Sequence, residues 1–134
     1  MKLVIFACVH NAGRSQMAAA WFRRLADPEA ARALSAGTEP GSRVHPEVLT
    51  AMQEVGIDLS VAKPELLTDA MLSEANHLIT MGCGDACPTA PPSVTRDDWP
   101  LEDPKGKSLE RVRAIRDEIR SRVATLVAEN DWEP

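Results

Sequence analysis

The sequence predicts an α/β fold: a single three-layer domain with a doubly wound, four-stranded parallel sheet and helices on both faces. Short apolar runs alternate along the chain with segments in which apolar residues recur at helical spacing, and this alternation is typical of a parallel sheet. The first run, residues 3–7, is apolar on both faces, as a buried central strand should be. We expect one domain over residues 1–134, because this length suits one core and the sequence contains no linker or internal repeat.

Proline, glycine and serine mark the ends of the expected elements. The first helix stops before Pro28, Gly37 closes the second strand and Gly56 stops the second helix. Ser108 is placed to cap a long amphipathic helix near the end of the chain. The expected strands are 3–7, 32–36, 76–81 and 94–99, and the expected helices are 15–26, 45–55, 64–74 and 109–130.

Composition and charge narrow the function classes. The net charge of −5 and the lack of a basic stripe argue against nucleic acid as a partner. The only apolar run near the N-terminus is too short to span a membrane and lacks a cleavage site, so we expect a cytoplasmic protein with no membrane partner. Three cysteines make an odd set with no secreted disulfide framework. In a reducing compartment such thiols are expected to be catalytic, redox-active or metal-bound.

The segment that joins the first strand to the first helix, CVHNAGRS at residues 8–15, is the strongest chemical signal. A tight loop at a helix N-terminus turns backbone N–H groups inward and binds oxyanions. The same positive field favours the thiolate form of Cys8, Arg14 offers a bidentate clamp, Gly13 permits a positive φ, and Ser15 can donate a hydrogen bond to the sulfur. The alternative interpretation is a buried cysteine that ends a strand, with an unrelated surface arginine. The expected oxyanion-binding residues are Val9, His10, Asn11, Ala12, Gly13, Arg14 and Ser15.

Three chemistry-bearing residues closely follow predicted strands. Cys8, Cys83 and Asp103 should therefore converge at the carboxyl edge of the sheet, where parallel sheets bind their ligands. Asp103 precedes Pro104, and the alternative interpretation is a turn-forming aspartate that fixes the Asp-Pro corner. His10 is interpreted as a loop residue, and His45 and His77 are interpreted as a helix-start residue and a strand-edge residue.

These residues carry a resemblance. Cys8 to Ser15, followed by Gln16-Met17-Ala18, resembles the phosphate loop of low-molecular-weight protein tyrosine phosphatases, and more closely that of the arsenate reductases built on the same fold. The resemblance continues to the final helix and implies reduction of arsenate to arsenite with no cofactor and no metal. The further segments that carry it are 35–38, 83–88, 97–99 and 103–104.

The resemblance also implies a thiol relay. Cys8 would attack the arsenic, and Asp103 would act as the general acid. Cys83 would then attack the sulfur of Cys8, and Cys87 would resolve the resulting disulfide so that thioredoxin can reduce the chain. The Gly-Cys-Gly-Asp-x-Cys-Pro form also resembles family members that use a small thiol, so mycothiol with a mycoredoxin stays open as the reductant, as does the order of attack.

The same residues allow three other functions. A zinc site could use His77, Cys83 and Cys87, although no fourth ligand is evident in the sequence. A phosphatase of this fold is a second alternative, but Lys105 stands where phosphotyrosine phosphatases carry an aromatic residue. A redox or oxyanion sensor is a third, and no DNA-binding motif supports it.

Overall fold

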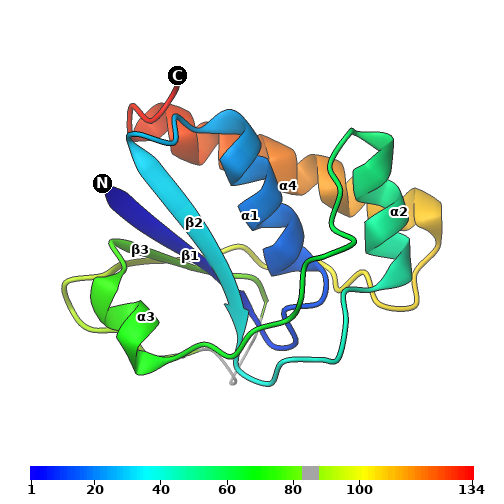
Figure 1. Cartoon of the computed structure of the whole chain (residues 1–134), viewed down its shortest axis with the longest axis horizontal. Helices are drawn as coiled ribbons and strands as arrows, with labels where there is room; N and C mark the ends of the chain where they lie inside the picture. The colour runs from blue at the N-terminus through cyan, green and yellow to red at the C-terminus, as the bar shows by residue number, and fades with distance from the viewer. Residues whose placement is uncertain (83–87) are drawn as a thin grey trace.

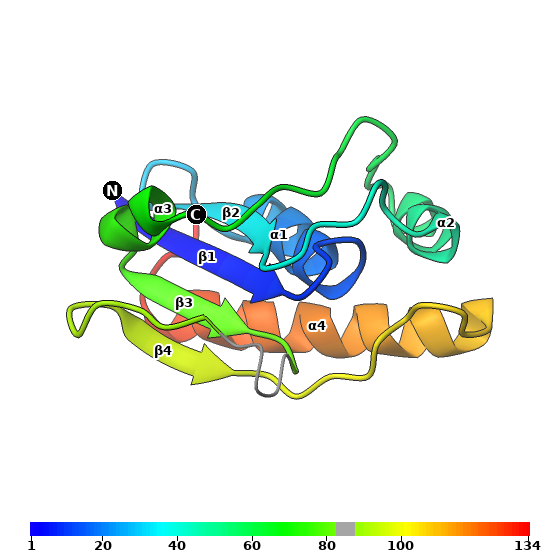
Figure 2. The ribbon, with the colours of Figure 1, turned by 90° about the horizontal axis from the view of Figure 1, so that it is seen from below.

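Four parallel strands form the sheet in the computed structural model, which describes residues 1–82 and 88–134. They lie in the order β2-β1-β3-β4 and all run in the same direction (Figures 1 and 2). The chain moves from β1 outward to β2 and then returns to the other side of β1, so the sheet is doubly wound, as predicted. The strands are β1 (Lys2–Cys8), β2 (Ala31–Gly37), β3 (His77–Thr80) and β4 (Thr95–Asp98).

Helices cover both faces of this sheet. The helices α1 and α4 pack against each other on one face, α2 packs on α4, and α3 lies on the opposite face (Figure 1). This confirms the expected arrangement. The helices are α1 (Arg14–Leu25), α2 (Pro46–Glu54), α3 (Asp69–Glu74) and α4 (Leu109–Glu129).

The central strand β1 divides the core into two apolar clusters. Val4 and Phe6 belong to the cluster beneath α1 and α4, whereas Leu3, Ile5 and Ala7 face α3. Successive side chains of a strand point to opposite faces, so a strand covered on both sides must be apolar throughout. The core therefore fixes the end of β1, and with it the position of the loop that follows.

The expected helix at 64–74 is wrong in its first half. Residues 64–68 instead pair with the last residue of β2, where Gly37 donates its N–H to the carbonyl of Glu65 (2.8 Å) and accepts from the N–H of Leu67 (2.9 Å). The backbone N–H and carbonyl of Gly37 need partners at the free edge of the sheet, and these residues supply them. The helix α3 begins only after Thr68, whose hydroxyl caps it by accepting from the N–H of Met71 (3.2 Å).

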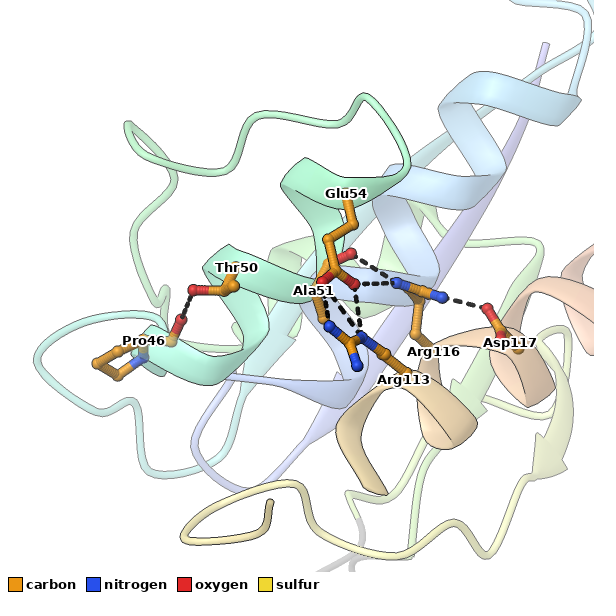
Figure 3. Close-up of polar contacts among 7 residues, drawn as sticks. All are labelled: Pro46, Thr50, Ala51, Glu54, Arg113, Arg116 and Asp117. Carbon is orange, nitrogen blue, oxygen red and sulfur yellow. Dashed lines mark hydrogen bonds and ion pairs between the residues drawn. The ribbon is translucent and has the colours of Figure 1, made fainter. Parts of the chain in front are cut away.

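The last helix begins as predicted. The hydroxyl of Ser108 accepts from the N–H of Arg111 (3.2 Å) and caps α4. Pairs of ionic and hydrogen-bonding contacts join α4 to α2: the carboxylate of Glu54 faces both Arg113 and Arg116 (Figure 3). Arg116 also donates to the carbonyl of Ala51 (2.9 Å), one of the last four carbonyls of α2, which have no partner within that helix.

Within residues 1–82 and 88–134, no helix combines the length and the apolar character that crossing a membrane requires.

Candidate functional site

The loop between β1 and α1 is the candidate site. Cys8 is the last residue of β1 and Arg14 the first of α1. Cys8, Asn11 and Ser15 are almost fully buried. The first turn of α1, residues 14–17, carries no acidic side chain, so the partial positive charge at this helix end is not neutralised from within.

The carbonyl groups of this loop all accept hydrogen bonds from surrounding residues. Because the peptide bonds are trans, each carbonyl lies antiparallel to the N–H of the next residue. Six bonded carbonyls therefore turn the N–H groups of residues 9–14 to the opposite, concave side of the loop. Successive N–H groups that share one concave side form an anion-binding nest. The six pairs are Cys8 with Thr38 N (3.4 Å), Val9 with Glu39 N (2.8 Å), His10 with Gly41 N (2.9 Å), Asn11 with Gln16 Nε2 (3.1 Å), Ala12 with His45 N (2.9 Å) and Gly13 with Met17 N (3.0 Å).

The thiol of Cys8 faces a hydroxyl whose proton has a defined direction. The backbone N–H of Glu65 donates to Asn11 Oδ1 (2.9 Å), which fixes the orientation of the Asn11 amide. Its Nδ2 group then donates to Ser15 Oγ (2.7 Å). Since Ser15 Oγ accepts there, its own proton is free to point at Cys8 Sγ, which lies 2.9 Å away. A donated hydrogen bond at this distance stabilises a thiolate.

The backbone of the loop departs from the sequence expectation in one respect. The left-handed residue is Asn11, with φ of 50°, whereas Gly13 has φ of −146° and His10 also lacks a positive φ. The prediction that Gly13 supplies a positive φ is therefore wrong. Gly13 is needed for space instead, since a methyl group at this position would lie 2.7 Å from Pro104 Cγ.

Arg14 and Asp103 meet above the loop. Arg14 donates from Nη1 to the carbonyl of Leu101 (2.9 Å), and its Nη2 lies 3.9 Å from Asp103 Oδ2. Arg14 is buried whereas Asp103 is half exposed. Asp103 also accepts from the N–H of Lys105 (3.0 Å), so it forms the turn and lies at the site at the same time. One pocket is lined by Cys8, His10, Ala12, Gly13, Arg14, His45 and Asp103.

The sequence matches the profile of the low molecular weight phosphotyrosine protein phosphatases over residues 3–133. The chain belongs to that family. Among the relatives, the arsenate reductase of Staphylococcus xylosus is 38% identical over 122 residues, which cover 89% of this chain and 91% of the relative. The glutaredoxin arsenate reductase of Synechocystis sp. is 39% identical over 132 residues, which cover 96% of this chain and 98% of the relative.

A solved member of this phosphatase fold gives the same result in three dimensions. The thioredoxin-dependent arsenate reductase of Corynebacterium glutamicum is similar to this chain with a TM-score of 0.82 and 39% sequence identity. The match covers 96% of this chain and 61% of that protein, so this chain spans less than two thirds of its length. The predicted resemblance and the predicted fold are both confirmed.

In this phosphatase-family chain, two of the three residues expected at the carboxyl edge of the sheet lie together. Cys8 and Asp103 line the same pocket. Cys83 and Cys87 lie outside the described residues. The residue before them, Gly82, has φ of 74° and packs so tightly on Arg14 that an added methyl group would lie 3.0 Å from Nη1.

Two of the three histidines, His10 and His45, line this pocket, and the third, His77, lies elsewhere. His10 is exposed, and its Nδ1 lies 3.0 Å from the carbonyl of Glu39. His77 begins β3, as expected for a strand-edge residue, and its ring packs edge-on against Trp132. His45 precedes α2 as predicted, but it also lines the pocket, which the sequence did not indicate. Across residues 1–82 and 88–134, no group of three or more His, Cys, Asp or Glu side chains could hold a metal ion.

A larger groove of about 370 Å³ lies between β4 and α4, away from Cys8. Its charged lining is mostly acidic: Asp97, Glu118 and Glu129 against Arg122. Like charges repel an anion, so this groove does not suit an oxyanion despite its size. The smaller pocket at Cys8 is distinguished by its chemistry, since it combines inward N–H groups with a guanidinium.

Proposed function

We propose that the chain is a cytoplasmic arsenate reductase that converts As(V) arsenate to As(III) arsenite through its own thiols. The observation that carries this proposal is the Cys8 loop: a buried thiol beside a hydroxyl donor, in a nest of inward N–H groups. The identity of 38–39% to named arsenate reductases over most of the chain supports arsenate as the oxyanion.

The first step is substitution at arsenic. The N–H groups of residues 9–14 and the Arg14 guanidinium hold the arsenate oxygens. Cys8 Sγ attacks arsenic and forms an As–S bond, while the bond from arsenic to one hydroxyl group breaks and that hydroxyl takes a proton from Asp103 and leaves as water. The position of the Asp103 carboxyl, 3.9 Å from Arg14 Nη2, supports this assignment. General acids of this kind contribute roughly 10²- to 10⁴-fold to the rate.

The second step is the reduction. The thiolate of Cys83 attacks Cys8 Sγ and forms a disulfide, the electron pair of the As–S bond passes to arsenic, and arsenite leaves. Cys87 then attacks Cys83, which releases the Cys8 thiolate and moves the disulfide to the Cys83–Cys87 pair. Two thiols supply both electrons, so no cofactor or metal is needed.

Thioredoxin is proposed as the reductant of that disulfide. The thioredoxin-dependent relative from Corynebacterium glutamicum supports this choice. The glutaredoxin arsenate reductase of Synechocystis sp. suggests glutaredoxin as one competing reductant. The resemblance of the Cys83 segment to family members that use a small thiol leaves mycothiol with a mycoredoxin as the other. A phosphatase function is less well supported, because Lys105 stands after Asp103-Pro104 in place of an aromatic residue that could stack on phosphotyrosine. Weak aryl-phosphate hydrolysis is expected as a side activity.

Peptide mass spectrometry after one equivalent of arsenate, with no external thiol, tests the relay. We expect one arsenite per chain and a Cys83–Cys87 disulfide. Cys87→Ser should stop the reaction at a Cys8–Cys83 disulfide, and Cys8→Ser should lower arsenite release by at least about 10³-fold.

Two other outcomes would contradict the proposed reductant or the proposed function. In one outcome, the thiols stay reduced after arsenate is added and the chain forms arsenite only when a small thiol is present. The mycothiol route would then replace thioredoxin as the proposed source of electrons. A chain that forms no arsenite with thioredoxin, glutaredoxin or a small thiol would overturn the proposed function.

A further inference from the structure

His45 lies at the oxyanion pocket without a role in the steps above. It lines the pocket together with Cys8, Arg14 and Asp103. Its ring lies against the loop, because Cδ2 would be 3.4 Å from a methyl group placed on Gly13. Its backbone N–H donates to the carbonyl of Ala12 (2.9 Å), so the same residue helps to turn the loop and borders the space that the loop encloses.

The helix α2 holds His45 in position. It immediately precedes α2, whose first residue is Pro46, and the far end of α2 is held on α4 by the contacts of Glu54 with Arg113 and Arg116 (Figure 3). The imidazole does not cap the helix. Within the described part of the chain, its ring nitrogens have no hydrogen-bond partner, so they are available to a bound ligand.

The charges around His45 oppose one another. Burial lowers the pKa of His45 below its ordinary value of 6.5. The carboxylates of Asp103 and Glu47 act in the opposite direction, and Lys105 and His10 reinforce the lowering. The net direction is downward, so the imidazole is neutral at pH 7 before an anion binds. A tetrahedral dianion beside it would favour the imidazolium.

We propose that His45 is a further oxyanion-contacting residue, which takes up a proton when a tetrahedral dianion binds and then pairs with it opposite Arg14. This inference rests on the proposed oxyanion site and adds a proton-linked contact to it. Binding is linked to protonation, so affinity for a dianion rises as the pH falls, by up to about tenfold per pH unit for one proton. Arg14 supplies a positive charge that is constant with pH. His45 supplies a positive charge only when a dianion is bound or when the pH is low.

Sulfate is the probe that isolates this effect, because it stays a dianion throughout the pH range in which histidine titrates. Calorimetric titrations with sulfate at pH 7, in two buffers of different ionisation enthalpy, measure the protons taken up on binding. We expect net uptake by the wild-type chain and a clear reduction in His45→Asn, whose sulfate affinity should also lose much of its increase between pH 8 and pH 6. The matched control is His77→Asn, which lies at the other end of the sheet and should behave as wild type.

A measurement on the unaltered chain covers the case in which His45→Asn does not fold. The imidazole C–H resonances report the titration of each histidine, and His77 serves as the internal control. The midpoint of His45 should rise when sulfate is added, and that of His77 should not move.

The outcomes separate this inference from the proposed function. Equal proton uptake by wild type and His45→Asn, or a His45 midpoint that sulfate leaves unchanged, would overturn the role of His45 while the oxyanion site stands. A wild-type chain that binds neither sulfate nor phosphate at any pH would overturn the oxyanion site itself.

Discussion

Two polar networks each hold the end of a helix in this molecule, and they differ in their surroundings. At the start of α1, neutral side chains of Asn11, Ser15 and Gln16 bond to one another and to backbone groups inside the protein. Between α2 and α4, the charged side chains of Glu54 and Arg113 meet at the surface (Figure 3).

The contact distances in the two networks are similar, so distance alone does not rank them. Water and salt screen the exposed ion pairs and weaken their effect. The buried amide and hydroxyl groups have no such substitute, and each lost partner leaves a group unsatisfied. The comparison teaches that the neutral network of Asn11, Ser15 and Gln16 controls the geometry of the site. The ionic network of Glu54, Arg113 and Arg116 contributes instead to stability, in a way that depends on pH.

Asn11→Ala should have the largest effect. It leaves the N–H of Glu65 and the amide of Gln16 without the Asn11 Oδ1 acceptor, and it frees Ser15 to turn away from Cys8. We expect a loss of about 2–4 kcal/mol in unfolding free energy and of roughly 10²-fold in arsenate turnover. Urea unfolding and arsenite formation measure the two. Asn76→Ala is the matched control, since it removes one hydrogen bond to Leu3 N away from the loop. Equal turnover losses in both variants would contradict the assignment.

Gly13→Ala should come next, with activity affected more than stability. The added methyl group meets Pro104 Cγ at 2.7 Å and pushes Asp103 away from Arg14. We expect turnover to fall roughly 10- to 100-fold. Gly41→Ala adds the same methyl group where its nearest neighbour is 3.7 Å away, so this control should keep near wild-type activity. A Gly13→Ala protein with full activity would contradict the proposed role of Asp103 in the reaction.

Arg116→Met and Arg113→Met sharpen the comparison within the ionic network. Arg116 is buried and donates to the carbonyl of Ala51, so its loss should cost about 1–2 kcal/mol in thermal or urea unfolding. Arg113 is exposed and bonds only to Glu54 within the described residues, so its loss should cost less. The reverse order would mean that charge outweighs burial here.

Glu54→Gln should have the smallest effect and a characteristic pH dependence. Hydrogen bonds from Arg113, and then from Arg116, lower the pKa of Glu54 from 4.5 to about 2. A lowered folded-state pKa gives stability that is complete above pH 4.5 and is lost as the pH falls toward 2. The difference in melting temperature between wild type and Glu54→Gln should therefore shrink over this interval. Glu118→Gln, which removes one surface pair with Arg122, is the matched control. A difference that stays constant down to pH 2 would refute the pairing.

Local signals in the sequence predicted most of the fold and all of the residues that line the pocket except His45. The apolar strand before Cys8 and the capping Ser108 act within a few residues, so their structures could be predicted. The extended path of residues 64–68 could not, because it depends on the free edge of β2. The position of His45 at the pocket could not be predicted for a similar reason. It depends on how α2 packs on α4, and the residues next to His45 in the sequence do not indicate that contact.

The two edges of the sheet are protected in different ways. At one edge, residues 65–67 already occupy hydrogen-bonding positions at the end of β2. At the other, β4 is only four residues long, and all of its side chains are exposed, with Arg96, Asp97 and Asp98 among them. A long apolar edge strand would offer a template for pairing with another chain. Concentrated solutions of this protein should accordingly resist strand pairing through β4, because a second molecule approaching that edge would have to bring its own backbone against charged side chains.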